Sequence, residues 1–213
     1  MQQSLVVIDD FYLDPDAIRK QALDLNFTSK LGATYPGKEA WIDDPRWLET
    51  HRILASFVHH DVSGACPKNP PFLQGKFRIA CASDQQTRLD GVHEDVQPWS
   101  GVIYLAKPED CHGQGAIAFY ENRETGLREA NNDWWIFISL KLGFAELNDE
   151  QRKAAYWQYM RDESQWLELE RLENKFNRAI LLHAKRFHGS IGLFGDRPEN
   201  SRLTQHFEFF HPI

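Results

Sequence analysis

Short apolar runs separated by turn residues dominate the second half of the sequence. The runs lie at residues 76–83, 101–106, 116–120, 178–183 and 202–210, with Gly, Pro and Asp between them. Runs of this length and spacing are typical of β-strands. Because they do not alternate with helices, and because the sequence contains no G-x-G-x-x-G or P-loop motif, a parallel α/β sheet is not indicated. The pattern predicts a mainly β fold, either a barrel or a jelly roll.

Helices are expected near the start of the chain, after one short strand at residues 5–8. Asp14-Pro15 and Asp44-Pro45 each combine a helix N-cap residue with a proline at the first helical position. Apolar residues at helical spacing follow both pairs, which predicts helices over residues 15–25 and about 45–58. We expect these helices to support the β-rich core from outside.

A charged stretch without Gly or Pro interrupts the strands at residues 148–175. An apolar stripe from Ala154 to Leu167 predicts one long inserted surface helix, or two helices with a break near Ser164. Residues 134–142, just before it, are apolar enough for either a strand or a buried helix, and their periodicity does not separate the two.

The length and composition fit one globular domain. With 213 residues, 42% of them hydrophobic and 26% charged, the chain can bury a sizeable core and is too apolar for wholesale disorder. We expect a single domain over residues 1–213. Residues 1–70 would form an N-terminal strand and supporting helices, and residues 75–210 the β core with its helical insert.

Charge, cysteine content and hydropathy argue against several classes of protein. A formal net charge of -7 without a basic run disfavours binding to nucleic acid or to a membrane surface. The three cysteines form no CxxC pair, which argues against a zinc knuckle or a disulfide framework and fits a reducing compartment. No signal peptide and no apolar stretch of membrane-spanning length is visible. We therefore expect a cytoplasmic protein.

The strongest candidate for chemistry is the H-x-D motif His93-Glu94-Asp95. In an extended segment, residues i and i+2 point to the same side, so His93 and Asp95 could bind one metal ion together. Two histidines and one carboxylate on one face form the ligand set of non-haem Fe(II) sites, which leave coordination positions open. The lack of a thiolate argues against a structural zinc site.

Two other segments match the same short pattern. His59-His60-Asp61 lies at the expected end of a helix, where a solvated terminus explains it. His206-Phe207-Glu208 is an H-x-E match on the last predicted strand. His93 is better placed, because it lies in a turn-rich connection between two predicted strands, where functional residues tend to occur.

The second histidine ligand must come from a distant part of the sequence, and three residues are candidates. His183 ends an apolar run and His112 lies in a polar turn, so each has an ordinary structural explanation. His188 lies between two predicted strands, at what would be the mouth of a barrel, and Arg202 opens the strand that follows.

This order of residues, from the H-x-D motif through His188 to Arg202, resembles the Fe(II)/2-oxoglutarate-dependent dioxygenase superfamily, in particular its prolyl-4-hydroxylase-like branch. The resemblance covers roughly residues 75–210, and the segment VVIDDFYLDPDAIRKQAL also resembles the start of some bacterial members. It implies a double-stranded β-helix, which is a jelly-roll barrel, buttressed by the N-terminal helices.

The resemblance also implies roles for individual residues. His93, Asp95 and His188 would bind Fe(II). Arg202 would hold the far carboxylate of 2-oxoglutarate through its planar guanidinium. Arg197, in the loop before this strand, is the competing candidate for that task.

Further residues are assigned around this centre. The Tyr104 hydroxyl would help to hold the same carboxylate, with an ordinary core aromatic as the alternative. Thr204 shares a strand face with Arg202 and would contribute to binding 2-oxoglutarate. His206 either lines the substrate pocket or packs in the core. Trp99 and Trp134 would form a substrate wall or, as aromatic residues more often do, part of the core.

The function that the resemblance implies is that of an iron-dependent oxygenase, most simply a hydroxylase. It would consume O₂ and 2-oxoglutarate and release succinate and CO₂. Halogenases of this superfamily lack the carboxylate ligand, so Asp95 favours hydroxylation, with desaturation or cyclisation as alternatives. The expected partner is a small-molecule or peptide substrate with an amino-acid-type moiety, either free, peptide-borne or in a natural-product intermediate. A monomer or homodimer is expected.

Two other functions fit the same residues. A cupin-like metalloprotein would use the His/Asp site without 2-oxoglutarate and would give Arg202 no role. A non-catalytic binding module on a degenerate jelly roll would not convert 2-oxoglutarate to succinate. Binding of 2-oxoglutarate and its conversion to succinate separate these three functions.

Overall fold

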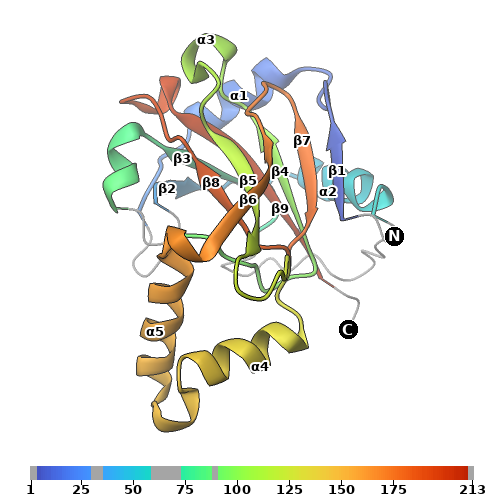
Figure 1. Ribbon diagram of the computed structural model, residues 1–213. Coiled ribbons are helices and arrows are strands. Elements are labelled where there is room, and N and C mark those ends of the chain that lie inside the picture. Colours follow the sequence, from blue (N-terminus) through green and yellow to red (C-terminus); the bar gives the residue numbers. More distant parts are fainter. Residues whose placement is uncertain (1–3, 30–35, 59–72, 88–90, 211–213) are drawn as a thin grey trace.

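The computed structural model describes residues 4–29, 36–58, 73–87 and 91–210, and Figure 1 shows their arrangement. The helices in these ranges are α1 (Pro15–Leu23), α2 (Arg46–Ser56), α3 (Pro108–Cys111), α4 (Asn132–Lys141) and α5 (Asp149–Arg161). The strands are β1 (Leu5–Ile8), β2 (Lys38–Ala40), β3 (Lys76–Ala80), β4 (Trp99–Tyr104), β5 (Ala116–Asn122), β6 (Trp166–Leu172), β7 (Ala179–His183), β8 (His188–Ile191) and β9 (Arg202–Phe209). None of these helices has the length and hydropathy needed to cross a membrane.

The strands form two antiparallel sheets. The large sheet has six strands in the order β1-β7-β4-β9-β3-β2, and the small sheet has three in the order β6-β5-β8. The prediction of a mainly β fold is confirmed. Across the described residues the two ladders stay separate, so the sequence-based expectation of a closed barrel is not met.

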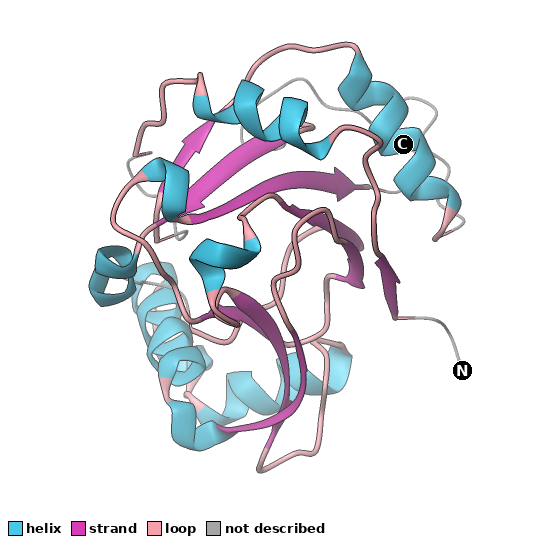
Figure 2. Ribbon diagram, turned by 90° about the horizontal axis from the view of Figure 1, so that it is seen from above, coloured by secondary structure: helices cyan, strands magenta, loops and turns pink. Residues whose placement is uncertain are grey.

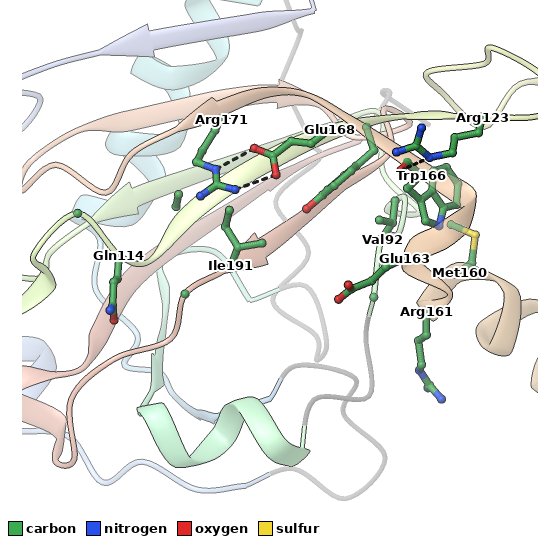
Figure 3. Close-up of a pocket in the computed structure, with 15 residues that line it drawn as sticks. Val92, Gln114, Arg123, Met160, Arg161, Glu163, Trp166, Glu168, Arg171 and Ile191 are labelled. Atoms are coloured by element: carbon green, nitrogen blue, oxygen red, sulfur yellow. Dashed lines mark hydrogen bonds and ion pairs between the residues drawn. The ribbon is translucent and has the colours of Figure 1, made fainter.

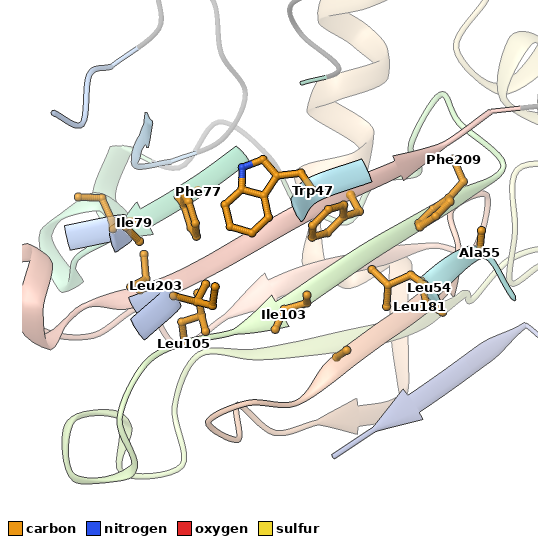
Figure 4. Packing of buried hydrophobic residues seen from close by; sticks show 14 residues of the cluster. Trp47, Leu54, Ala55, Phe77, Ile79, Ile103, Leu105, Leu181, Leu203 and Phe209 are labelled. Atoms are coloured by element: carbon orange, nitrogen blue, oxygen red, sulfur yellow. The ribbon is translucent and has the colours of Figure 1, made fainter. Parts of the chain in front are cut away.

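Strict alternation of side chains gives the large sheet one apolar face toward the N-terminal helices. Ile103 of β4, Leu181 of β7 and Phe207 of β9 are fully buried on this outer face. Trp47 and Leu54 of α2 pack against them, as Figure 4 shows. The two N-terminal helices predicted from the sequence are thus confirmed, and they cover the large sheet from outside (Figure 2).

The opposite face of the large sheet packs against the small sheet. Val102 of β4 and Ile180 of β7 pack with Ile117 and Phe119 of β5. Val102 and Ile180 each precede by one residue a side chain that faces the helices. The molecule therefore has three layers, with helices outside, the large sheet in the middle and the small sheet beyond it. The polar residues on this inner face lie between the sheets.

Helices α4 and α5 form a hairpin inserted between β5 and β6, and it projects from one end of the sheets (Figure 1). The Asn131 side chain accepts a hydrogen bond from the Trp134 amide at 3.0 Å, which caps α4 and settles the ambiguous run at residues 134–142 as a helix. The buried Trp134 ring packs 4.7 Å from the Phe187 ring and 5.8 Å from the Trp166 ring, centroid to centroid. These aromatic contacts attach the hairpin to the body of the protein.

The structure corrects the prediction of a helical insert over residues 148–175. Helix α5 ends at Arg161, and β6 follows as a strand that pairs with β5. The Asp162 side chain accepts a hydrogen bond from the Ser164 amide at 3.0 Å, which turns the chain out of the helix. Residues 167–171 of β6 are exposed, so this strand carries as many charged residues as a solvated helix face does. Charge alone could not separate the two structures.

Truncating a residue of α2 tests the packing of the helical layer. Leu54→Ala should lower the free energy of unfolding by about 2–5 kcal/mol, because Leu54 is fully buried against the large sheet. Leu48→Ala is the matched control on the same helix, where Leu48 is 41% exposed, and its cost should stay within about 0.5 kcal/mol. Equal losses in the two variants, measured by urea unfolding, would contradict this packing.

Candidate metal centre

The segment that carries His93 is held against the start of β8 by its backbone. The His93 amide donates to the His188 carbonyl at 2.9 Å, and the His188 amide donates back to the His93 carbonyl at 2.8 Å. The Asp95 amide donates to the Ala184 carbonyl at 2.8 Å, and Lys185 Nζ donates to the Asp95 carbonyl at the same distance. The H-x-D segment therefore runs antiparallel to the β7–β8 connection.

This pairing brings His93, Asp95 and His188 together. One ligand atom from each of the three side chains lies within 4.8 Å of the others. The two imidazole rings are 4.5 Å apart between centroids, and His188 Nε2 lies 3.6 Å from Asp95 Oδ2. One ion can bridge such a span, and two imidazoles with one carboxylate suit Fe(II) among the metals that proteins bind. That the three residues are iron ligands stays a prediction.

Both histidines are oriented by hydrogen bonds from the nitrogen that faces away from the cluster. His93 Nδ1 lies 3.1 Å from the Gly91 carbonyl oxygen, and His188 Nδ1 lies 2.7 Å from the Arg186 carbonyl oxygen. Because a carbonyl only accepts, Nδ1 carries the proton in each ring, which leaves Nε2 unprotonated in the neutral imidazole. Metal-binding histidines are fixed in this way by backbone or carboxylate partners.

Asp95 is kept ionised by its neighbours. Burial raises the pKa of Asp95, but the hydrogen bond and charge of His188 outweigh it and hold the pKa well below its usual range. Burial lowers the pKa of His188, and Asp95 reverses that effect, so the His188 pKa is raised. His188 Nε2 and Asp95 Oδ2, 3.6 Å apart, form an ion pair when the imidazole is protonated. A bound cation would replace the imidazolium proton as the partner of the carboxylate.

A serine on the large sheet holds the carboxylate from the other side. Ser100 Oγ donates to Asp95 Oδ2 at 2.8 Å, and Gln97 Nε2 donates to Ser100 Oγ at 2.6 Å. Both Ser100 and Gln97 are buried. Sequence reasoning missed this pair. The available signal was strand alternation, because Ser100 lies two residues before the inner-facing Val102 on β4 and therefore on the same face.

A cavity of about 310 Å³ opens between the two sheets beside the cluster. Its walls come from the H-x-D segment, from both sheets and from α5. Besides the three clustered residues, the lining includes Arg78, Ser100, Ile117, Trp157, Leu182, Ser190, Arg202, His206 and Glu208. A volume near the lower limit for small-molecule pockets favours small ligands.

Arg202 lies in the wall of this cavity with part of its guanidinium unpaired. Its side chain is almost completely buried, and Nε donates to the Gly115 carbonyl at 3.1 Å. Nη1 is buried and has no hydrogen-bond partner within the described ranges. The rival Arg197 is two-thirds exposed and lies 3.9 Å from Glu199. Of the two arginines considered for binding 2-oxoglutarate, Arg202 is thus buried in the cavity wall and Arg197 lies at the surface.

Tyr104 supplies a second unpaired donor next to Arg202. The arginine Cζ lies 5.5 Å from the centroid of the tyrosine ring, and the buried hydroxyl finds no partner in hydrogen-bonding geometry among the described residues. Burial raises the pKa of Tyr104, and the positive charge of Arg202 and its approach to the hydroxyl oxygen oppose that rise only in part, so the phenol stays protonated. A buried donor without an acceptor is costly. Arg202 lines the cavity, and Tyr104 lies behind it, outside the lining.

Thr204 and His206 form a pair further along β9. Thr204 Oγ1 and His206 Nε2 are 2.9 Å apart, and Arg78 Nη1 lies 3.4 Å from His206 Nδ1. Burial, with the positive charges of Arg78 and Lys76, lowers the pKa of His206 well below its usual range, so this ring is neutral. His206 lines the cavity. Thr204 holds His206, and its predicted contact with 2-oxoglutarate stays a prediction.

The structure places neither Trp99 nor Trp134 in the lining of the cavity. Trp134 is fully buried in the aromatic cluster under the helical hairpin. Trp99, at an odd-numbered position of β4, packs toward the helical layer and meets the His183 ring edge-on at 5.7 Å. Both positions fit the core alternative for these tryptophans, and Trp157 of α5 lines the cavity.

The rival histidines lie outside the cluster. His183 Nδ1 is 3.5 Å from Glu129 Oε2 at the end of β7. His112 is exposed and ends α3 in a left-handed conformation, with φ at 44°. The competing motif His59-His60-Asp61 lies outside the described residues.

A larger hollow of about 660 Å³ lies on the outer face of the small sheet, next to the end of α5 (Figure 3). Two of its arginines are engaged within the protein. Arg171 Nε and Nη2 donate to the Glu168 carboxylate at 2.8 Å each, and Arg123 Nε donates to the Trp166 carbonyl at 2.9 Å. The His/Asp cluster, the one candidate for holding a metal among the described residues, belongs to the smaller cavity. The smaller cavity is therefore the better candidate for a functional site.

Comparisons with known proteins assign no activity. The sequence matches the model of a family of unknown function over residues 1–209, and no curated protein matches it. Similar solved structures include the Fe(II)/(alpha)ketoglutarate-dependent dioxygenase TqaL, at 12% identity and a TM-score of 0.47 over 99% of this chain and 83% of that one. IDO from Bacillus thuringiensis is 10% identical with a TM-score of 0.43, over 99% of this chain and 92% of that one. The non-heme iron oxygenase OrfP is 11% identical with a TM-score of 0.33, over 93% of this chain and 80% of that one. All three TM-scores are below 0.5, so the function is inferred from the residues of this chain.

Removing one predicted ligand tests the metal centre. His188→Ala should weaken Fe(II) binding by more than about 100-fold, since even the loss of a residue that only hydrogen-bonds to a metal ligand costs about 10–100-fold. The measurement is anaerobic calorimetric titration with Fe(II). His112→Asn is the control, because Asn tolerates the left-handed backbone at this exposed position. Unchanged binding in His188→Ala would remove His188 from the site.

Ser100→Ala tests the support of the carboxylate. The variant keeps all three predicted ligands but loses the donor to Asp95, so Fe(II) affinity should fall by about 10–100-fold. Circular dichroism should show that the sheet is intact. An Fe(II) affinity equal to that of the wild type would mean that Ser100 does not hold the carboxylate in the metal-bound state.

Proposed function

Because the chain belongs to DUF6445, a family of unknown function, we propose its activity from the cavity itself: it is an Fe(II)- and 2-oxoglutarate-dependent oxygenase that hydroxylates a small substrate. One observation carries this proposal. Arg202, whose buried Nη1 has no hydrogen-bond partner among the described residues, lines the same cavity as the His93, Asp95 and His188 cluster. A metal site and an anion site in one small cavity suit a chelating carboxylate cosubstrate.

The three clustered side chains fit Fe(II). They offer two imidazole nitrogens and one carboxylate oxygen, and this ligand set leaves further coordination positions open. The carbonyl partners of the two Nδ1 atoms direct Nε2 toward the cluster. Ser100 fixes Asp95 Oδ2 from outside the coordination sphere. These contacts give the chain a ready geometry for the ion.

Arg202 and Tyr104 fit the far carboxylate of 2-oxoglutarate. The guanidinium offers a charge-assisted hydrogen bond, and the neutral phenol offers a second donor to the same anion. Neither group has an acceptor within the protein ranges described. A dicarboxylate with one end at the metal and the other at Arg202 would satisfy both donors.

With iron, 2-oxoglutarate and O₂ bound, the centre would convert a substrate C–H bond to C–OH while 2-oxoglutarate is split to succinate and CO₂. The protein's own residues supply the geometry. Arg202 and Tyr104 hold and orient the cosubstrate, Ser100 fixes Asp95, and Ile117 and Leu182 give the cavity apolar walls that limit access of water.

We also propose that the two sheets form a double-stranded β-helix. From β3 onward the chain crosses repeatedly between them, with β3, β4, β7 and β9 in the large sheet and β5, β6 and β8 in the small one. The H-x-D segment extends the small sheet through its bridge to β8. Repeated crossing between two facing sheets is expected of a double-stranded β-helix.

Replacing Arg202 tests the cosubstrate site. Arg202→Gln should weaken 2-oxoglutarate binding by at least about 30-fold while leaving Fe(II) binding unchanged, because it removes a buried charge partner away from the metal ligands. The control is Arg197→Gln at the exposed competitor. Anaerobic addition of 2-oxoglutarate to the Fe(II) protein, followed by visible absorption, reports both events.

The same titration separates the alternatives. Iron binding without any effect of 2-oxoglutarate would sink the dioxygenase proposal and favour a cupin-like metalloprotein. Binding of both without succinate formation in air, in the absence and presence of candidate substrates, would favour a non-catalytic module.

A further inference from the structure

Two charged side chains that the metal and cosubstrate do not use face the same cavity from neighbouring strands. Arg78 lies on β3 and Glu208 on β9. Both are partly buried, and both lie on the inner face of the large sheet. They belong to the part of the cavity that Arg202 does not occupy, because β9 runs away from Arg202 toward Glu208.

Glu208 is directed into the cavity by the pairing of its own backbone. Its amide donates to Gln74 Oε1 at 3.1 Å, and its carbonyl accepts from Gln74 Nε2 at 2.8 Å. His51 Nε2 lies 3.2 Å from the same carbonyl oxygen. Alternation along β9 then puts the Glu208 side chain on the face of Arg202 and His206, while Phe207 and Phe209 face the helices.

The Glu208 carboxylate lacks a partner for one of its oxygens. Oε2 is buried and has no hydrogen-bond partner within the described parts of the chain. Burial raises the pKa of Glu208 to about 7, against the positive charges of Lys76 and Arg78. Glu94, the other non-ligand carboxylate of the lining, is satisfied instead, because the Tyr156 hydroxyl donates to it at 2.7 Å. Only Glu208 therefore offers the cavity a buried acceptor that the described protein does not use.

Arg78 lies on the other side of His206 from Glu208. Its Nε donates to Glu39 Oε1 at 2.7 Å, and its Nη1 lies 3.4 Å from His206 Nδ1. In the sheet Arg78 is paired with Thr204, and His206 and then Glu208 follow on the same strand face at steps of about 7 Å. A cationic group and a carboxylate thus lie on the two sides of the neutral His206 ring, along one wall of the cavity.

Glu39 pairs with both Lys76, at 3.2 Å, and Arg78, at 2.7 Å. Of these three residues only Arg78 lines the cavity, where an ionised Glu208 is the opposite charge. A ligand with one negative and one positive group offers each of these two side chains an opposite charge. The cavity of about 310 Å³ must also hold the cosubstrate, which leaves room for a small molecule only.

We propose that Arg78 and Glu208 bind the substrate, and that the substrate is a free amino acid whose carboxylate meets Arg78 and whose ammonium group meets Glu208. This inference rests on the proposed function, because it places the substrate beside the metal centre. The two charged groups of the zwitterion would pair with Arg78 and Glu208, which the cosubstrate does not use. Its side chain then points toward the metal or toward the apolar lining at Ile117 and Leu182.

The test uses the full chain loaded anaerobically with Fe(II) and 2-oxoglutarate. Three probes are titrated by calorimetry: an equimolar mixture of the proteinogenic amino acids, the same mixture N-acetylated, and the same mixture amidated at the carboxyl group. Binding is expected for the free amino acids alone. Succinate formation in air should rise with that mixture and stay at its basal rate with the other two.

Two variants connect this binding to the wall. Glu208→Gln and Arg78→Gln should each weaken binding of the free amino acids by at least about tenfold, while Fe(II) and 2-oxoglutarate affinities stay unchanged. Glu150→Gln, at an exposed position of α5, is the matched control. Melting curves show whether each variant folds, and if one does not, the three mixtures test the proposal on the wild-type protein alone.

The outcomes are distinct. Equal binding of the N-acetylated mixture overturns the role of Glu208, and equal binding of the amidated mixture overturns the role of Arg78. Failure of all three mixtures to bind overturns the amino-acid assignment. Failure of Fe(II) or 2-oxoglutarate to bind, measured first in the same protein, overturns the proposed function instead.

Discussion

The candidate site depends on two backbone hydrogen bonds that join His93 and His188. These residues lie far apart in the sequence, and each amide donates to the carbonyl of the other. The reciprocal pair fixes the distance between their Cα atoms and sets both imidazoles on one side of the small sheet. Asp95 is positioned next to them by the hydrogen bond from its amide to the Ala184 carbonyl. The geometry of the three side chains is thus a consequence of strand pairing and not of loop conformation.

Strand β9 connects that centre to the rest of the cavity. It is flanked on both sides by other strands of the large sheet, so its backbone is fixed along its length. Arg202, Thr204, His206 and Glu208 share its inner face at a period of two residues. The alternation that packs the opposite face against the helices therefore also sets the order of cationic, neutral and acidic groups along the cavity.

Motif order and local patterns predicted a good part of this arrangement. The H-x-D spacing, His188 and Arg202 could be selected because they stand at ends or connections of recognisable strands. Cross-strand neighbours could not be selected, since pairing register is a property of the folded sheets. Ser100 beside Asp95 and Arg78 beside His206 are examples, and the same lack of register left the wall and core alternatives for Trp99 open.

The helical hairpin contacts the cavity through few residues. Trp157 contributes to the lining, and the Tyr156 hydroxyl binds Glu94 between the two ligand positions of the H-x-D motif. All three predicted ligands and Arg202 come from segments outside the hairpin. Insertions, deletions or exchanges within α4 and α5 can therefore alter one side of the cavity while the arrangement of His93, Asp95 and His188 stays the same. The side that α5 contributes and the proposed metal centre can in this sense change independently in evolution.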